Sequence, residues 1–131
     1  MMKKPKLHVT ILKEDVGYSA NVVSKNKFIA AEADTFDHLL TNLVEAINLT
    51  FEENGFFYQL NELKFTYDLE SFFEYYTVIN AKALSERIGM NQSLLAQYIK
   101  GIKKPSAAQI RRILTGVQQI GKELAEVQLL F

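Results

Sequence analysis

Residues 79–114 read INAKALSERIGMNQSLLAQYIKGIKKPSAAQIRRIL, and their spacing predicts three consecutive helices separated by short breaks. Asn80, Asn91 and Ser106 each precede a run in which apolar residues recur at intervals of three or four, and such polar residues are favourable helix N-caps. Gly89 follows the first run, where glycine commonly ends a helix. The stretch therefore predicts a small helical bundle.

The first two of these helices are separated only by Gly89-Met90-Asn91. A short turn with a glycine between two short helices is the signature of a helix-turn-helix, whose second helix enters the major groove of DNA. Polar residues at the start of that helix are the candidates for contacts with base edges: Asn91, Gln92, Ser93 and Gln97. Basic residues beside it are the candidates for contacts with phosphates: Lys100, Lys103, Lys104 and Arg87.

The charge distribution points the same way. The chain of 131 residues is neutral, with 15 basic and 15 acidic residues, yet residues 1–68 carry a net charge of −3 and residues 69–131 carry +3. Between Glu86 and Glu123 no acidic residue occurs. Positive charge is thus available where a polyanion would lie. Helical hairpins with basic loops also occur in proteins that do not bind DNA, so a protein-interaction adaptor remains an alternative.

The first half of the chain predicts strands followed by a helix. Apolar and polar residues alternate in LHVTIL (7–12), YSANVV (18–23) and FIAAEA (28–33), which favours an antiparallel meander. A helix capped by Thr35 is expected to run to Asn54-Gly55 and to cover one face of the sheet.

A fourth strand is predicted at residues 62–69, ELKFTYDL, paired either with the first sheet or with a second copy of the chain. We place the domain boundary in the preceding connector, which gives an N-terminal domain at 1–61 and a C-terminal domain at 62–131. The expected fold class is α+β, with a further helix from Leu69 to Ile79.

Several packing expectations concern the C-terminal domain. The last helix is expected to bury a stripe on one side, made of Ile110, Ile113, Leu114 and Val117. Tyr75 is expected to point outward and to serve as a dimer contact. Residues 124–131 fit either a continuation of the helix or a terminal strand.

Other chemistry finds little support in the sequence. There is no cysteine, which excludes disulfides and thiol nucleophiles, and no apolar run approaches the ~20 residues that cross a bilayer. His8 and His38 are far apart, and Asp15, Glu32 and Asp34 do not suggest a convergent metal site. We therefore expect no enzyme activity, no cofactor, no metal and no membrane association, and a cytoplasmic location.

The helical stretch resembles the lambda-repressor-like (XRE-type) helix-turn-helix family over about residues 69–117. The features that carry the resemblance are Ala83 and Leu84 in the first helix, the turn glycine Gly89, Gln92 and Ser93, Gly101, and Lys104-Pro105-Ser106.

The first half resembles HicB-like antitoxins, through GYSANVV and ADTFDHLLTNLVEAINLTFEE. The two resemblances together imply a partial ribonuclease-H-like βββα domain, without catalysis, followed by a lambda-repressor-like bundle. They imply an antitoxin that neutralises an RNA-cleaving HicA-like toxin and represses its own operon as a homodimer or higher oligomer on operator DNA. The toxin-binding residues are not specified. A stand-alone XRE-type repressor, whose sheet serves only dimerisation, is a second alternative.

Overall fold

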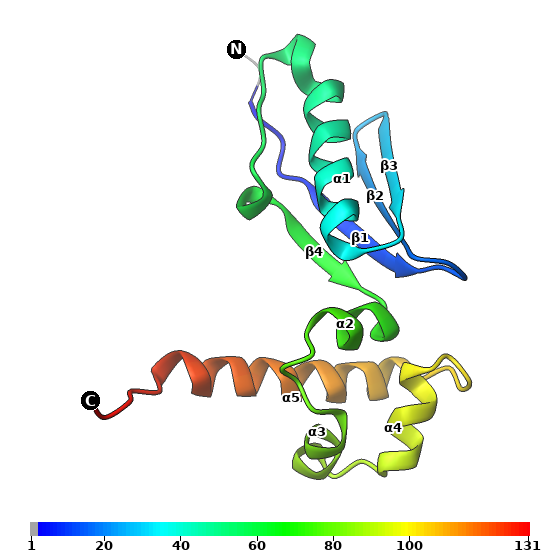
Figure 1. Ribbon diagram of the computed structural model, residues 1–131, viewed down its shortest axis with the longest axis vertical. Helices are drawn as coiled ribbons and strands as arrows, with labels where there is room; N and C mark the ends of the chain where they lie inside the picture. Colours follow the sequence, from blue (N-terminus) through cyan, green and yellow to red (C-terminus); the bar gives the residue numbers. More distant parts are fainter. Residues whose placement is uncertain (1–2) are drawn as a thin grey trace. The chain divides into compact units, whose positions relative to one another are not determined.

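The computed structural model describes residues 3–131 and divides into two compact units, the first ending at Tyr75 and the second beginning at Tyr76 (Figure 1). The first unit contains β1 (His8–Lys13), β2 (Tyr18–Ser24), β3 (Lys27–Ala33), α1 (Phe36–Phe51), two short 3-10 turns (Glu52–Asn54 and Leu60–Glu62), β4 (Lys64–Tyr67) and α2 (Leu69–Tyr75). The second contains α3 (Ala81–Ile88), α4 (Gln92–Ile99) and α5 (Ala107–Glu126). The expected α+β class is confirmed.

The four strands form one sheet in the order β3-β2-β1-β4. β1, β2 and β3 are antiparallel neighbours, so the expected meander is confirmed. β4 pairs with β1 in parallel, with His8 opposite Lys64 and Ile11 opposite Tyr67. Of the two pairings that the sequence left open for residues 62–69, the structure therefore has the one within the first sheet.

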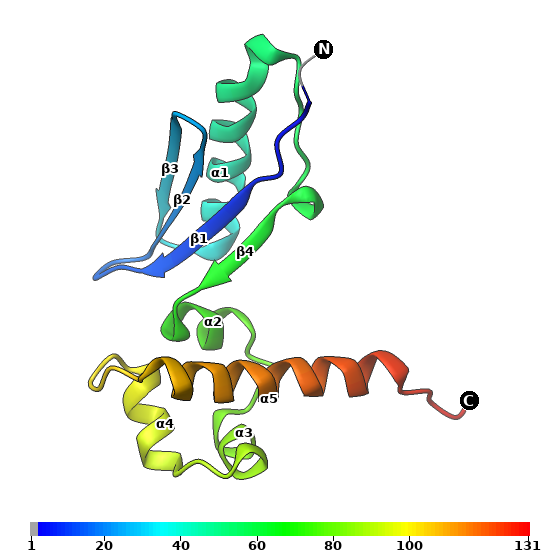
Figure 2. The same cartoon turned by 180° about the vertical axis from the view of Figure 1, so that it is seen from behind.

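The helix α1 covers one face of this sheet, as expected. Its buried side chains recur at helical spacing and meet the inward residues of the strands: Leu39, Leu43, Ile47 and Phe51. Strand residues alternate, so those on the other face remain accessible (Figure 2). On that face Val23 and Phe28 stand opposite each other in the β2–β3 ladder, 68% and 69% exposed.

The expected boundary between residues 61 and 62 differs from the observed division after Tyr75. β4 belongs to the first unit because it completes the sheet. Asp68 then ties the start of α2 to β1, since one carboxylate oxygen accepts the Lys13 N–H at 2.8 Å and the other accepts the Ser71 N–H at 2.9 Å. A local change from strand to helical periodicity did not reveal this long-range bond.

The helix that contains Tyr75 is shorter than expected, because it ends at Tyr75 and does not continue to Ile79. Tyr75 is 39% exposed, so its expected outward position is confirmed. Its ring also packs within the first unit, with its centroid 4.8 Å from that of Phe36 and 6.2 Å from that of Tyr67. The dimer contact that the sequence assigned to Tyr75 stays a prediction.

The core of the second unit is small. Its buried apolar residues are one from each helix and one from the turn between α3 and α4: Leu84, Leu95, Ile113 and Met90. The expected inner stripe of α5 is wrong in part, because Ile110 is 38% exposed and Leu114 is 49% exposed. Ile113, between them in the sequence, is the residue of this stripe that is buried in the core.

The end of the chain resolves the choice left open for residues 124–131. α5 continues to Glu126, and residues 127–131 form neither helix nor strand. Among residues 3–131, no helix combines the length and apolar character needed to cross a membrane.

Candidate nucleic-acid interface

Two adjacent caps set the turn between α3 and α4. Gly89 ends α3 with φ at 67°, a left-handed conformation in which glycine is favoured. Asn91 begins α4, because its side-chain oxygen accepts the Leu94 N–H at 3.1 Å. Met90, between them, is buried and donates its N–H to the Ser85 carbonyl at 2.8 Å. Three residues therefore stop one helix, anchor the turn in the core and start the next helix.

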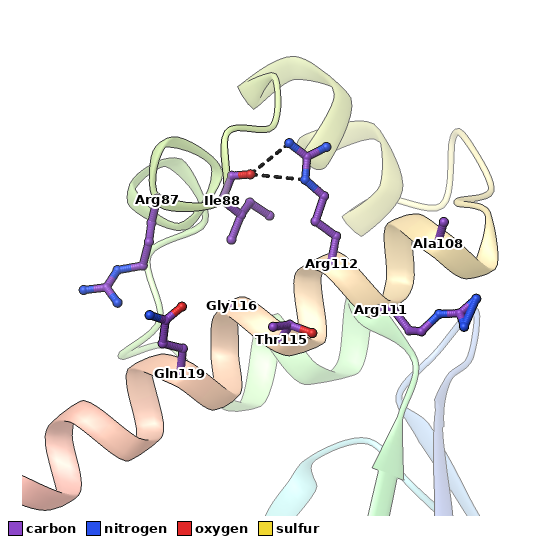
Figure 3. A pocket seen from close by; sticks show the side chains of 8 residues that line it. All are labelled: Arg87, Ile88, Ala108, Arg111, Arg112, Thr115, Gly116 and Gln119. Atoms are coloured by element: carbon purple, nitrogen blue, oxygen red, sulfur yellow. Dashed lines mark hydrogen bonds between the residues drawn. The ribbon is translucent and has the colours of Figure 1, made fainter.

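A guanidinium group from α5 holds the same turn (Figure 3). Arg112 donates to the Ile88 carbonyl from two nitrogens, at 3.1 and 2.9 Å, and to the Gly89 carbonyl at 2.7 Å. Carbonyls at the end of a helix have no partner within it, and arginine carries several donors in a fixed fork. Arg112 thus fastens the end of α3 to α5. The sequence analysis missed this role and counted only the charge.

The same two helices approach closely at Gly116, which is buried in α5. A β-carbon at this position would lie 2.4 Å from Cγ2 of Ile88, well inside contact distance. A larger residue at position 116 would therefore require the Ile88 side chain, or α3 with it, to move. The angle of α3, and hence the start of α4, depends on this contact together with Arg112.

Arg87, a candidate for phosphate contact, is already engaged. Its guanidinium donates two hydrogen bonds to the Glu123 carboxylate, at 2.7 and 3.1 Å. These hydrogen bonds hold the pKa of Glu123 below its ordinary value and raise that of Arg87. The pair joins α3 to the second half of α5, so we remove Arg87 from the phosphate-contacting set.

The first turn of α4 presents polar side chains to solvent. Gln92 and Ser93 are exposed, and within residues 3–131 neither side chain has a hydrogen-bond partner in the structure. Asn91 is also exposed, but its oxygen is used by the cap. Gln97 is half-buried, so it is less available than the sequence suggested. The side chains best placed to read bases are therefore those of Gln92 and Ser93.

The loop after α4 carries the lysines. Lys100, Lys103 and Lys104 are all exposed, and none of them forms an ion pair within the described part of the chain. The loop is ordered by the Gln97 carbonyl, which accepts the N–H groups of Ile102 at 3.0 Å and of Lys103 at 3.3 Å. Ile102 is 72% exposed beside these lysines, a feature that the sequence analysis overlooked.

A pocket between α3 and α5 is lined by three arginines, Arg87, Arg111 and Arg112, together with Thr115 and Gln119 (Figure 3). Two of the guanidinium groups are occupied, one by Glu123 and one by backbone carbonyls. Arg111 is exposed and has no ion pair among the described residues. The pocket therefore retains little free donor capacity for an anion.

The first unit gathers acidic groups at one edge of the sheet. Four carboxylates line a shallow pocket together with Tyr18, namely those of Glu14, Asp15, Glu32 and Asp34. The sequence did not suggest that Asp15, Glu32 and Asp34 would converge, although the structure places them around one depression. Among the described residues, however, no group of three His, Cys, Asp or Glu side chains is arranged to hold a metal ion. His8 bonds to Thr66 on the open face of the sheet, and His38 is exposed on α1.

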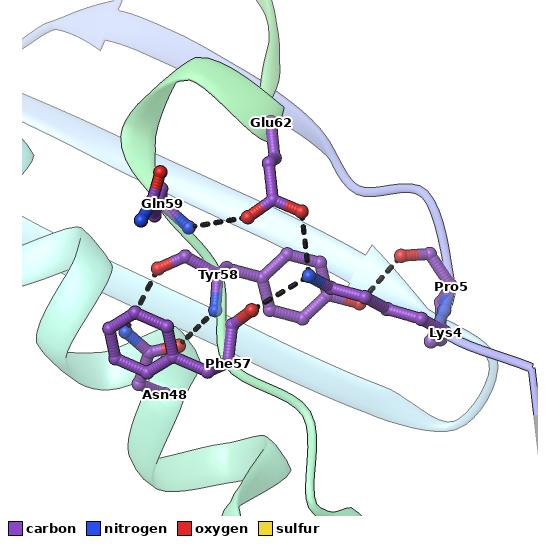
Figure 4. A network of polar contacts seen from close by, with 7 residues as sticks. All are labelled: Lys4, Pro5, Asn48, Phe57, Tyr58, Gln59 and Glu62. Carbon is purple, nitrogen blue, oxygen red and sulfur yellow. Dashed lines mark hydrogen bonds and ion pairs between the residues drawn. The ribbon is translucent and has the colours of Figure 1, made fainter.

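The connector before β4 is fixed by a polar network (Figure 4). The Asn48 side chain bonds both to the N–H of Tyr58, at 2.7 Å, and to its carbonyl, at 3.1 Å. The Tyr58 hydroxyl donates to the Pro5 carbonyl, and Lys4 lies over the Tyr58 ring. Lys4 also donates to Glu62 at 2.6 Å, which lowers the pKa of that carboxyl. The network thus holds the connector, whose residues 56–60 read FFYQL, against α1.

Comparison with protein families, with curated proteins and with solved structures found no match to this chain.

Proposed function

We propose that the second unit binds duplex DNA through α4 and that the chain acts as an antitoxin-like repressor of its own operon. The observation that carries the proposal is the start of α4, where Gln92 and Ser93 are exposed and, within residues 3–131, have no side-chain hydrogen-bond partner. Three lysines lie beside them that form no ion pair in the same described range. A helix whose first turn projects in this way suits a major groove, in which amide and hydroxyl groups meet base edges. The lysines would supply the contacts with phosphates.

The fixed geometry of the turn adds support. Base readout needs a helix held at a defined angle, and the two caps, buried Met90 and the Arg112 fork restrict that angle. Residues 87–122, a stretch of 36 residues that includes α4, contain no acidic residue. An adaptor that contacts proteins does not require such unopposed positive charge beside this helix.

The first unit is the proposed partner-binding part. A three-stranded meander followed by a helix fits the βββα arrangement of the HicB-like domain that the sequence resembles. Its acidic edge, with Glu14, Asp15, Glu32 and Asp34, is complementary in charge to a basic, RNA-binding toxin. The exposed pair Val23 and Phe28 supplies apolar area on the open face of the sheet.

The interface predicts different effects for lysine and glutamine substitutions. In Lys103→Ala/Lys104→Ala, loss of two phosphate contacts should reduce the slope of log affinity against log salt by about 2 on every duplex. In Gln92→Ala, loss of a base contact should reduce the ratio of the two affinities, for the duplex upstream of the chain's own reading frame and for a scrambled duplex, by roughly 5- to 100-fold. Fluorescence anisotropy at several salt concentrations, on this duplex and on a scrambled one, measures both.

Gln118→Ala provides the control, because Gln118 is an exposed glutamine on α5 outside the turn. It should alter neither the salt slope nor the preference. Binding that does not depend on salt would contradict the proposed phosphate contacts. Equal loss on both duplexes for Gln92→Ala would contradict direct readout by α4.

The antitoxin part of the proposal predicts a protein complex. When the chain is co-expressed with the product of the adjacent reading frame, we expect a small basic protein to co-purify in a fixed ratio. Glu32→Lys should reduce the recovered partner at least about tenfold by reversing charge at the acidic edge. Glu45→Lys makes the same change on the exposed side of α1 and should not. Absence of a complex would leave the stand-alone repressor as the better reading.

A further inference from the structure

The helix α5 is much longer than the helices it packs on. Its 20 residues span about 30 Å, whereas the 8 residues of α3 span about 12 Å. The ion pair Arg87–Glu123 joins α3 to the second half of α5. From residue 121 to residue 131 every side chain is exposed. Figures 1 and 2 both show the end of α5 continuing past α3 and α4.

The projecting half of α5 keeps an apolar face. Val117, Ile120, Leu124 and Val127 follow Ile113 at intervals of three or four residues, so they continue the side that is buried against α3. Leu124 is 62% exposed and Val127 is 57% exposed. The stripe that serves as core around Ile113 is thus half-buried at Val117 and Ile120 and exposed at Leu124 and Val127.

The stripe is complementary to itself. When two copies of α5 are set antiparallel about Lys122, Val117 of each copy meets Val127 of the other, and Ile120 meets Leu124. Lys122 points away from this seam, since it lies two residues from both Ile120 and Leu124 on a helix of 3.6 residues per turn. Gly121 flanks the seam and has no side chain to hold the two helices apart.

The same pairing matches the geometry of a duplex. At a rise of about 1.5 Å per residue, the two copies of Ile113 would lie roughly 27 Å apart along the helices, and the two copies of Ala107 roughly 45 Å apart. These two separations bracket the spacing of about 34–36 Å between adjacent half-sites. This spacing argument rests on the proposed DNA binding, whereas the apolar stripe does not.

We propose that residues 117–127, the end of α5 and its C-cap Val127, form an antiparallel homodimer interface with the same segment of a second copy. The chain that follows α5 extends this interface. Leu129, Leu130 and Phe131 are 80%, 103% and 118% exposed, and in the antiparallel arrangement they run toward the open flank of the partner copy's α5. That flank carries Ile110 and Leu114, the two residues that the bundle leaves uncovered. The pairing thus accounts for both sets of exposed apolar side chains.

The oligomeric state of the full chain tests the proposal. Sedimentation equilibrium should show a dimer for the unaltered chain and a monomer for Leu124→Asp, whose dimer dissociation constant should rise at least about tenfold. Gln118→Asp makes the same charge change on the opposite, exposed side of α5 and should remain dimeric. A monomeric unaltered chain, or equal behaviour of the two variants, would overturn the proposed interface.

A pair of cysteines tests the register, because the chain contains no cysteine of its own. In Val117→Cys/Val127→Cys, the two positions are about 15 Å apart on one helix, too far for an internal disulfide. Oxidation should give dimers in which position 117 is linked to position 127 of the other copy. Links of 117 to 117 and of 127 to 127, identified by peptide mass spectrometry, would refute the antiparallel arrangement.

These measurements use no DNA, so they separate the interface from the proposed function. A dimer that depends on Leu124 but binds no duplex would support the interface and contradict the repressor. Tight, sequence-selective binding of a duplex by a monomer would support the proposed DNA binding and contradict the interface.

Discussion

Gly17→Ala is expected to destabilise the first unit by about 3–4 kcal/mol, the sum of a left-handed backbone and an unavoidable clash. Gly17 has φ at 73°, and a β-carbon there would lie 2.3 Å from the Ala33 carbonyl oxygen and 2.8 Å from Cα of Asp34. Both atoms belong to the backbone at the end of β3, so no change of rotamer relieves the contact. Either the β1–β2 turn or the end of β3 must move.

Gly55→Ala is a matched control for this prediction. Gly55 has φ at 74°, nearly the same value, but a β-carbon there would meet nothing within 4 Å. Gly55→Ala should therefore lower the free energy of unfolding of the first unit by only about 1–2 kcal/mol, the cost of the left-handed conformation. Urea unfolding followed by the amide signals of β2 measures the first unit separately from the second. Equal midpoints for the two variants would show that the close approach at Gly17 is not needed.

Arg112→Met should weaken duplex binding by at least about tenfold, because the hydrogen bonds of a charged group to the end of α3 contribute roughly 1.5–3 kcal/mol. Without them the Ile88 and Gly89 carbonyls turn to water, and the angle between α3 and α4 is no longer fixed. Hydrogen exchange at the turn, measured without DNA, should become faster. Fluorescence anisotropy measures the accompanying loss of affinity.

Arg111→Met separates this positioning role from simple loss of charge. The two arginines are neighbours on α5, but only Arg112 bonds the turn. Arg111→Met should leave exchange at the turn unchanged. Arg112→Lys keeps the charge and therefore the salt slope, yet it cannot span two carbonyls and should still lose affinity. An affinity for Arg112→Lys equal to that of the unaltered chain would show that charge alone matters.

Local features of the fold were predictable from the sequence. Thr35, Asn80, Asn91 and Ser106 each cap the helix that follows, with side-chain oxygens accepting first-turn N–H groups. These interactions join residues three apart, so the sequence pattern contains all of the information. The alternation in β1, β2 and β3 was equally direct, since one face of each strand is buried.

Features that depend on distant partners were not predictable. The place of β4 in the sheet depends on its pairing with β1, and the unit boundary follows from that pairing. Arg112 bonds a carbonyl 24 residues away, and Arg87 bonds a carboxylate 36 residues away. The sequence alone shows only that both arginines add positive charge near the turn, because it does not show which groups they contact. Only the tertiary arrangement assigns them to holding helices together.

The candidate site shows the same division. Exposure of Gln92, Ser93 and the lysines followed from their positions outside the apolar stripe of α4. The half-buried state of Gln97 did not follow from its position in the sequence.

The exposed side chains of Gln92 and Ser93 have a consequence for specificity. Every group that shapes the turn lies elsewhere: in Gly89, Met90, the Asn91 cap and Arg112. Substituting residues 92 and 93 therefore removes no side-chain hydrogen bond within residues 3–131. If α4 reads DNA as proposed, changes at these two positions would alter the preferred duplex at little cost in folding.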